Sequence, residues 1–190
     1  MRKSKTILPL IGCILLALLF FGLTREKNSY QRTYTSYQVP DVTLVNQHNQ
    51  PVPLRTFLAP DKPLMLEFIF TSCTTLCPNQ SVKFSNFQKR LAPDTEQVRL
   101  VSITVDPETD TPEVLLHYLK QYQAQPGWEF LTGSKKDIKL VMNAFGIKPS
   151  DMITLDSSLL LRSTESGKWV RIDGQVHSED FYREYQRLIQ

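Results

Sequence analysis

Residues 64–78, LMLEFIFTSCTTLCP, constrain the fold more than any other stretch of this sequence. Six of the first seven residues are apolar, which is typical of a strand buried on both faces of a parallel sheet. A short polar turn follows and holds Cys73 and Cys77. Pro78 suits the first turn of a helix, where its missing N–H breaks no intrahelical bond. We therefore predict that the two thiols lie where a central strand gives way to a helix.

That position favours thiol chemistry. Open α/β sheets hold their sites at the carboxyl ends of strands, and the partial positive charge of a helix N-terminus stabilises a thiolate. We expect sulfurs within disulfide range, with Cys73 as the more exposed nucleophile and Cys77 as the buried resolving thiol. The alternative is a pair of buried structural thiols, which would not need close spacing at a helix start.

The first 27 residues form a separate segment. Arg2, Lys3 and Lys5 precede an uncharged run, Ile7 to Leu23, that is long for a signal peptide and has no small-x-small cleavage pattern after it. We interpret residues 1–27 as an uncleaved, single-pass signal anchor. The basic N-terminus places it in the cytoplasm and the following domain on the periplasmic or extracytoplasmic side of the inner membrane.

The remaining chain divides into a polar tether, residues 28–40, and one domain, residues 41–190. The chain has 22 Lys and Arg against 19 Asp and Glu, but five of these basic residues and one of the acidic residues lie in the anchor, which leaves a net charge of −1 beyond it. No basic surface for nucleic acid is expected. The domain keeps one cysteine pair and no wider disulfide framework.

The pattern along the domain alternates strands with helices. We expect a hairpin, a strand, a helix, a strand, a helix, a short strand, a helix, a hairpin and a last helix, at residues 42–54, 64–70, 78–91, 99–105, 112–122, 128–131, 135–145, 159–172 and 178–189 respectively. Asp110 or Thr111 can cap the second helix, and Ser134 the third. This order predicts an α/β fold with a mostly parallel central sheet, flanking helices and edge hairpins. The cysteine pair narrows it to a thioredoxin-like arrangement.

At this point the sequence resembles the Sco/SenC family of membrane-anchored thioredoxin-fold proteins. The resemblance covers residues 40–175 and rests on four blocks in order, which are residues 42–54, FTSCTTLCP at 70–78, VSITVDPETDTPE at 101–113 and FLTG at 130–133. It implies work on the copper centre of cytochrome oxidase, either by carrying copper or by reducing the cysteines that receive it. In the family, the two cysteines and a histidine before the second hairpin hold copper.

That histidine is missing here, where Asp156 or Ser157 occupies its place. Thiolate plus imidazole is the ligand set that favours copper, and neither replacement supplies an imidazole. We expect the domain to hold Cu(I) through Cys73 and Cys77 and to bind Cu(II) weakly.

Glu67 is a second departure from the family, because it interrupts an apolar strand six residues before Cys73. Thioredoxins carry an acidic residue at that spacing, buried under the second cysteine. Burial there would raise the pKa of the carboxyl group and let it exchange a proton with Cys77. The alternative is a solvated carboxylate at the sheet's rim. Asp106, at the end of the next strand, could also approach the site or simply start a turn.

Three functional classes follow from these observations. The first, which we favour, is a redox protein that reduces an exported thiol protein or an oxidase subunit and is itself restored by a thiol reductant. The second is a copper carrier, marked by stoichiometric retention of Cu(I). The third is a binding module without turnover, for which replacing either cysteine by serine would leave the phenotype intact.

Overall fold

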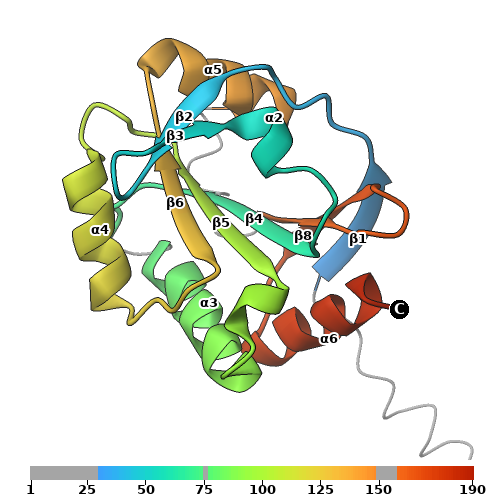
Figure 1. Cartoon of the computed structure of the whole chain (residues 1–190). Helices are drawn as coiled ribbons and strands as arrows, with labels where there is room; N and C mark the ends of the chain where they lie inside the picture. Colours follow the sequence, from blue (N-terminus) through green and yellow to red (C-terminus); the bar gives the residue numbers. More distant parts are fainter. Residues whose placement is uncertain (1–29, 75–76, 149–157) are drawn as a thin grey trace, which may run out of the picture.

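The computed structural model describes residues 30–74, 77–148 and 158–190, and it places one sheet between two layers of helices (Figure 1). The strands are β1 Tyr30–Thr35, β2 Thr43–Asn46, β3 Pro51–Pro53, β4 Leu64–Ile69, β5 Arg99–Thr104, β6 Trp128–Thr132, β7 Ser158–Arg162 and β8 Trp169–Gly174. The helices are α2 Leu54–Phe57, α3 Cys77–Leu91, the short 3-10 helix η1 Thr95–Gln97, α4 Pro112–Gln121, α5 Lys135–Ala144 and α6 Ser178–Leu188. The predicted thioredoxin-like α/β arrangement is confirmed, with α3 directly after β4.

The sheet is mixed, which corrects the prediction of a mostly parallel sheet. Its order is β1-β8-β7-β4-β5-β6-β2-β3. Among the strands that the structure describes, only β4, β5 and β6 run parallel to one another. The hairpin of β7 and β8 adds antiparallel to β4, and the hairpin of β2 and β3 adds antiparallel to β6. Both predicted hairpins do lie outside the parallel strands, as expected of edge hairpins, but together with β1 they make the sheet mixed.

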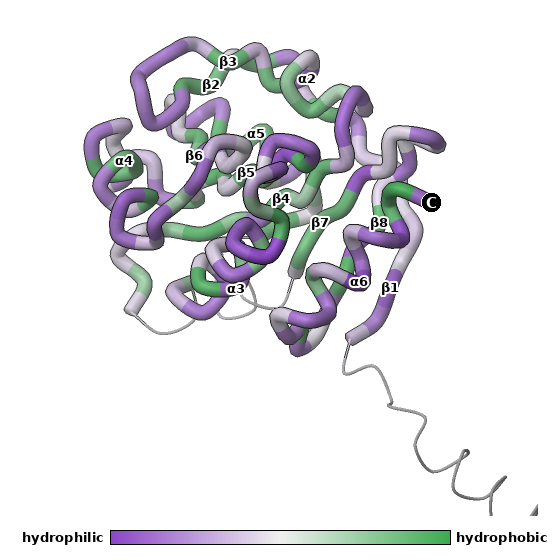
Figure 2. Tube along the Cα trace, turned by 60° about the horizontal axis from the view of Figure 1, so that its bottom comes forward, coloured by the Kyte–Doolittle hydropathy of each residue, from purple (hydrophilic) through white to green (hydrophobic). Residues whose placement is uncertain are grey.

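The two faces of the sheet carry different helices. One face is covered by α3, α4 and α6, which contribute Phe84, Tyr118 and Phe181 to its core. The other is covered by α2 and α5, which contribute Leu54 and Val141. Figure 2 shows the apolar central strands between helices whose outer faces are polar. Because side chains alternate along a strand, neighbouring residues of β4 reach opposite cores.

Helix starts follow the predicted caps. The Thr111 hydroxyl accepts a hydrogen bond from the N–H of Val114, and Pro112 occupies the first turn of α4. Ser134 caps α5 by accepting from the N–H of Asp137 at 3.1 Å. Thr111, and not Asp110, is thus the cap of α4, which leaves the Asp110 side chain for another role.

The domain begins earlier than predicted. Tyr30–Thr35, which we assigned to a polar tether, forms the edge strand β1 and pairs antiparallel with β8 along its length. Tyr37 then packs against Phe145, with ring centroids 4.8 Å apart, and against Trp169. The tether assignment is therefore wrong for these residues. The polar alternation of β1 is that of a strand with one face in water.

The predicted anchor, residues 1–27, lies outside the described residues. Within residues 30–74, 77–148 and 158–190, no helix combines the length and apolar character needed to cross a bilayer.

Candidate functional site

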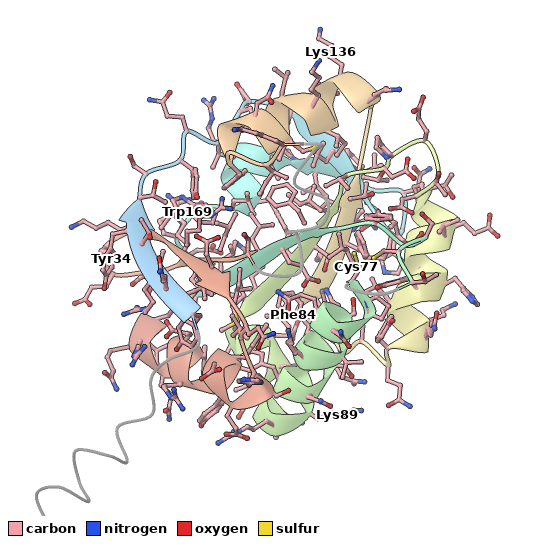
Figure 3. The ribbon with its side chains drawn as sticks, turned by 180° about the vertical axis from the view of Figure 1, so that it is seen from behind. Tyr34, Cys77, Phe84, Lys89, Lys136 and Trp169 are labelled. Atoms are coloured by element: carbon pink, nitrogen blue, oxygen red, sulfur yellow. The ribbon has the colours of Figure 1, made fainter. Side chains whose placement is uncertain are left out.

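The two cysteines come together between β4 and α3. The N–H of Cys73 donates to the carbonyl of Phe70 at 3.3 Å, and the N–H of Cys77 donates to Sγ of Cys73 at 3.4 Å. The two side chains also hydrogen-bond to each other, and both carry thiols rather than a disulfide. Figure 3 places Cys77 at the start of α3, with Phe84 further along the same helix. The sequence prediction of paired thiols at a strand-to-helix junction is confirmed.

The two thiols differ in exposure. Cys73 is half-buried, whereas Cys77 is 2% exposed. Burial raises the pKa of the Cys77 thiol, Cys73 and the charge of Glu67 raise it further, and a hydrogen bond with the backbone of Phe70 opposes them. Cys77 is therefore a neutral thiol near neutral pH. The backbone N–H of Cys77 points at Cys73 Sγ, which holds this sulfur at the start of α3.

Glu67 is buried on the face of β4 that α3 covers. Its residue exposure is 1%, and it shares this face with Met65 and Ile69, two residues before and after it. The Ser102 hydroxyl on β5 donates to Glu67 Oε1 at 2.6 Å. The indole N–H of Trp128 on β6 donates to the Ser102 oxygen at 2.9 Å. The alternative of a solvated carboxylate at the rim is therefore wrong.

The direction of this hydrogen-bond chain is fixed by chemistry. An indole N–H can only donate, so the Ser102 oxygen accepts from Trp128 and its own proton points to Glu67. On the same face, the hydroxyls of Ser81 and Tyr118 lie 2.9 Å apart. Burial raises the pKa of Tyr118, and the charge of Glu67 adds to that effect. The charge of Glu67 thus acts on two buried groups of the same core, the Tyr118 hydroxyl and the Cys77 thiol.

A second buried acid, Asp110, was not predicted as a site residue. Asp110 has an exposure of 0%, and its carboxylate accepts hydrogen bonds from Thr71 and Thr104. Asp106, which we considered as a site residue, is half-buried and donates its backbone N–H to Thr104 Oγ1 at 2.9 Å. The sequence did contain a sign of this site, because Asp106 and Asp110 both follow a core strand. Both residues are equally typical of turns and helix caps, so the pattern did not single them out.

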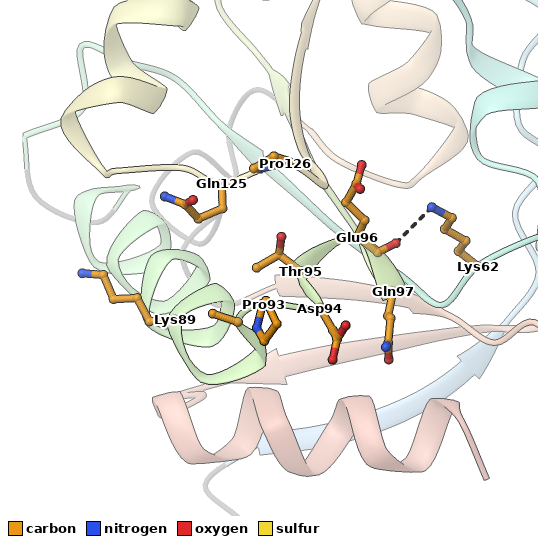
Figure 4. A pocket seen from close by; sticks show the side chains of 10 residues that line it. Lys62, Lys89, Pro93, Asp94, Thr95, Glu96, Gln97, Gln125 and Pro126 are labelled. Atoms are coloured by element: carbon orange, nitrogen blue, oxygen red, sulfur yellow. Dashed lines mark hydrogen bonds between the residues drawn. The ribbon is translucent and has the colours of Figure 1, made fainter.

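A surface pocket lies at the other end of the sheet. Its volume is about 780 Å³, and it is lined by Lys62, Lys89, Pro93, Asp94 and Gln125 among others (Figure 4). Lys62 precedes β4 and donates to the carbonyl of Glu96 before β5. The pocket therefore faces the amino ends of the parallel strands, whereas the cysteines follow their carboxyl ends.

Comparison with known proteins identifies the family. The family model described as SCO1/SenC matches residues 31–178, which is most of the chain. The chain belongs to the SCO1/SenC family. The match begins within β1, at residue 31, and includes the cysteine loop, so the family region also takes in residues that we had assigned to a tether.

Relatives of this SCO1/SenC protein agree with that assignment. The SCO1 protein homolog of Bacillus subtilis is 34% identical over 99 residues, which are 52% of this chain and 50% of the relative. The chain thus spans about half the length of such relatives. Among solved structures, BsSco, described as a member of the Sco family of cytochrome c oxidase assembly proteins with a disulfide switch, is 28% identical with a TM-score of 0.64, covering 82% of this chain and 95% of that one. Arabidopsis thaliana ScoI with copper bound is 26% identical with a TM-score of 0.61, covering 80% and 99%.

The donor set of this SCO1/SenC chain suits a soft metal ion. Within the part of the chain that the structure describes, no group of three or more His, Cys, Asp or Glu side chains is placed to hold a metal. The Cys73 and Cys77 thiols alone could hold Cu(I), which soft sulfur ligands select. Asp156 and Ser157, one of which we predicted to occupy the place of the family's histidine, lie outside the described residues.

The buried Cys77 thiol predicts a pH dependence of stability. Its pKa is raised above the ordinary value of 9.0, so the folded state holds this proton more tightly than the unfolded state does. The resulting stabilisation is fully present below pH 9 and is lost as the pH rises above it. The free energy of unfolding of the reduced protein should therefore fall above pH 9 more steeply than that of Cys77→Ala, by up to about 1.4 kcal/mol per pH unit. Urea unfolding under reductant from pH 7 to 10.5 measures this difference, and parallel curves would contradict it.

Proposed function

We propose that this domain reduces disulfides through Cys73 and Cys77 during assembly of the cytochrome c oxidase copper centre. The observation that carries the proposal is a buried carboxyl group, Glu67, whose charge acts on Cys77, together with a thiol pair in which Cys73 is partly accessible and Cys77 is buried and neutral. A carboxylate close enough to act on a buried thiol can serve as the proton acceptor that the thiol needs before it can attack.

The proposed reaction balances as a two-electron exchange. The Cys73 thiolate attacks one sulfur of the substrate disulfide, which forms a mixed disulfide and releases one substrate thiolate. Cys77 gives its proton to Glu67 and attacks Cys73 Sγ, which forms the protein disulfide and releases the second substrate thiolate. Glu67 then gives this proton to the second substrate thiolate, and solvent protonates the first. The substrate disulfide is reduced to two thiols, the protein pair is oxidised, and an exported thiol reductant restores it.

We propose that this reaction takes place on the periplasmic or extracytoplasmic side of the inner membrane. The sequence of residues 1–27 supports an uncleaved anchor, and the substrate is an exported thiol protein such as an oxidase subunit. Retention of the full chain in the membrane fraction after carbonate washing tests the anchor, and a soluble mature form that begins after Leu23 would contradict it.

Single cysteine variants test the exchange directly. Cys77→Ser should accumulate a mixed disulfide with a model disulfide protein through Cys73, because the resolving thiol is gone. Cys73→Ser should accumulate none, because the remaining thiol is buried and neutral. Non-reducing electrophoresis after alkylation distinguishes the two variants. Equal trapping by both, or no dithiol–disulfide equilibrium in the wild type, would reject the reductase assignment.

Copper carriage is the second candidate function, and the copper-bound Arabidopsis relative favours it. We expect the reduced domain to retain Cu(I) against a competing chelator and to show weak Cu(II) thiolate charge-transfer absorption. Ser157→His or Asp156→His should raise Cu(II) binding, whereas Ser166→His in the exposed hairpin turn is the matched control and should not. Tight Cu(II) binding by the unmodified protein would mean that another residue completes the site.

A further inference from the structure

Asp110 links two loops at the carboxyl end of the parallel strands. Both of its carboxylate oxygens lie near the N–H of Thr71, at 3.3 and 3.2 Å. The Thr71 hydroxyl also donates to Asp110 Oδ1, and the Thr104 hydroxyl donates to Oδ2. The whole residue is inaccessible to solvent. One carboxylate from the loop before α4 thus binds the loop that follows β4 and the last residue of β5.

The arrangement around Asp110 determines the direction of each bond. Thr104 Oγ1 accepts from the N–H of Asp106, so its own hydroxyl proton points to Asp110. The N–H of Asp110 donates to the carbonyl of Asp106 at 3.0 Å, which holds the acid in a closed turn. Thr111 performs the capping of α4. The side chain of Asp110 is therefore committed to the two threonines and not to the helix that follows it.

Thr71 lies at the entrance to the cysteine loop. It is two residues before Cys73, whose N–H bonds back to Phe70. The far end of the loop is held separately, because Cys77 begins α3 and is buried against the sheet. Asp110 therefore fastens the Cys73 end of the loop to β5, the strand that pairs with β4. The separation of the two sulfurs depends on this attachment as well as on α3.

We propose that Asp110 is a positioning residue that holds Cys73 against Cys77 and thereby sets the stability of their disulfide. This inference rests on the proposed function in one respect, because it requires that Cys73 and Cys77 interconvert between a dithiol and a disulfide. A disulfide tolerates a narrow range of Cα and Cβ separations, so a fixed loop raises the effective concentration of one thiol at the other. A loosened loop lowers that concentration, which favours the dithiol and makes the protein a weaker reductant.

Asp110→Asn tests this proposal with little change in size. The amide nitrogen cannot accept a hydrogen bond, so one of the threonine bonds is lost. We expect the equilibrium constant for disulfide formation, measured against a dithiothreitol redox buffer, to fall about ten-fold, which raises the reduction potential by about 30 mV. Asp41→Asn makes the same chemical change at an exposed side chain and should leave the potential unchanged.

A second variant covers the case in which Asp110→Asn does not fold. Thr71→Val removes only the hydroxyl bond to Asp110 and should shift the potential in the same direction by a smaller factor, while Thr109→Val, at an exposed position of the same loop as Asp110, should not. A merely structural role would lower the unfolding free energies of the oxidised and reduced forms equally and leave the potential unchanged.

The outcomes separate this inference from the proposed function. A wild-type protein that cycles, together with unchanged potentials in Asp110→Asn and Thr71→Val, overturns the role of Asp110 alone. A wild-type protein without a dithiol–disulfide equilibrium overturns both. A raised potential in either variant, with its matched control at the wild-type value, supports Asp110 as the residue that holds the loop.

Discussion

Glu67→Gln is expected to slow thiol–disulfide exchange by about ten-fold or more while leaving the fold intact, because an acid–base group is lost. Glutamine keeps the shape of the side chain, and its amide oxygen can still accept the hydrogen bond from Ser102. The substitution removes the carboxylate that we propose takes a proton from Cys77. Because burial keeps Cys77 protonated near neutral pH, the variant has no internal base for the resolving step.

The pH profile distinguishes a lost base from a disturbed site. Without Glu67, deprotonation of Cys77 depends on hydroxide, so the deficit of the Gln variant should be largest at pH 6 and should shrink as the pH rises. Stopped-flow exchange with a model disulfide between pH 6 and 8 measures it. Glu165→Gln, on the exposed hairpin turn, is the control and should match the wild type. Equal rates for Glu67→Gln and the wild type would remove our main reason for ranking a reductase above a carrier.

The chemistry of this site was largely predictable from local sequence. The apolar run of β4, the spacing of Cys73 and Cys77 and the position of Pro78 are read within fifteen residues, and the structure confirms the junction that they predict. The exposures of the two thiols followed from the same reasoning. Caps were predictable for a similar reason, because Thr111 and Ser134 act on their own helices.

Features that depend on distant residues were less predictable. The burial of Glu67 depends on α3 and on the Ser102–Trp128 chain from β5 and β6, none of which the sequence of β4 reveals. The role of Asp110 likewise depends on Thr71, which is 39 residues away. The edge hairpins were predicted, but the strands that they pair with, β4 and β6, were not, because local patterns indicate strands and not their neighbours in a sheet. The polar strand β1 resembled a tether for the same reason.

Glu184→Leu is expected to lower the free energy of unfolding by about 3 kcal/mol, near the lower end of the cost of breaking a buried ion pair. Glu184 is fully buried on α6. Its carboxylate accepts from the Tyr30 hydroxyl at 2.7 Å, lies 3.0 Å from Nε of Arg32 and pairs with Arg187. Leucine fills a similar volume but leaves these donors without their acceptor. The two arginine side chains are 26% and 37% exposed, so they can turn partly toward water, which limits the loss.

Glu179→Gln is the matched control for this prediction on the same helix. Glu179 pairs with Arg90, but both side chains are largely exposed, so its loss should cost about 0.5 kcal/mol or less. Urea unfolding of the two variants under reductant gives the comparison. Similar losses for both would mean that the charges of the buried cluster only offset the cost of their own desolvation.

The consequence of losing Glu184 should be concentrated at β1. This edge strand has one sheet neighbour, β8, and the Tyr30 and Arg32 contacts with Glu184 attach it to α6 as well. Edge elements with few attachments open at lower free energy than the core. In Glu184→Leu, the amides of Tyr30–Thr35 should therefore exchange with deuterium faster relative to those of β4 and β5 than in the wild type. If amide exchange instead became faster by the same factor in all strands, Glu184 would stabilise the domain as a whole. It would then have no separate role in holding β1.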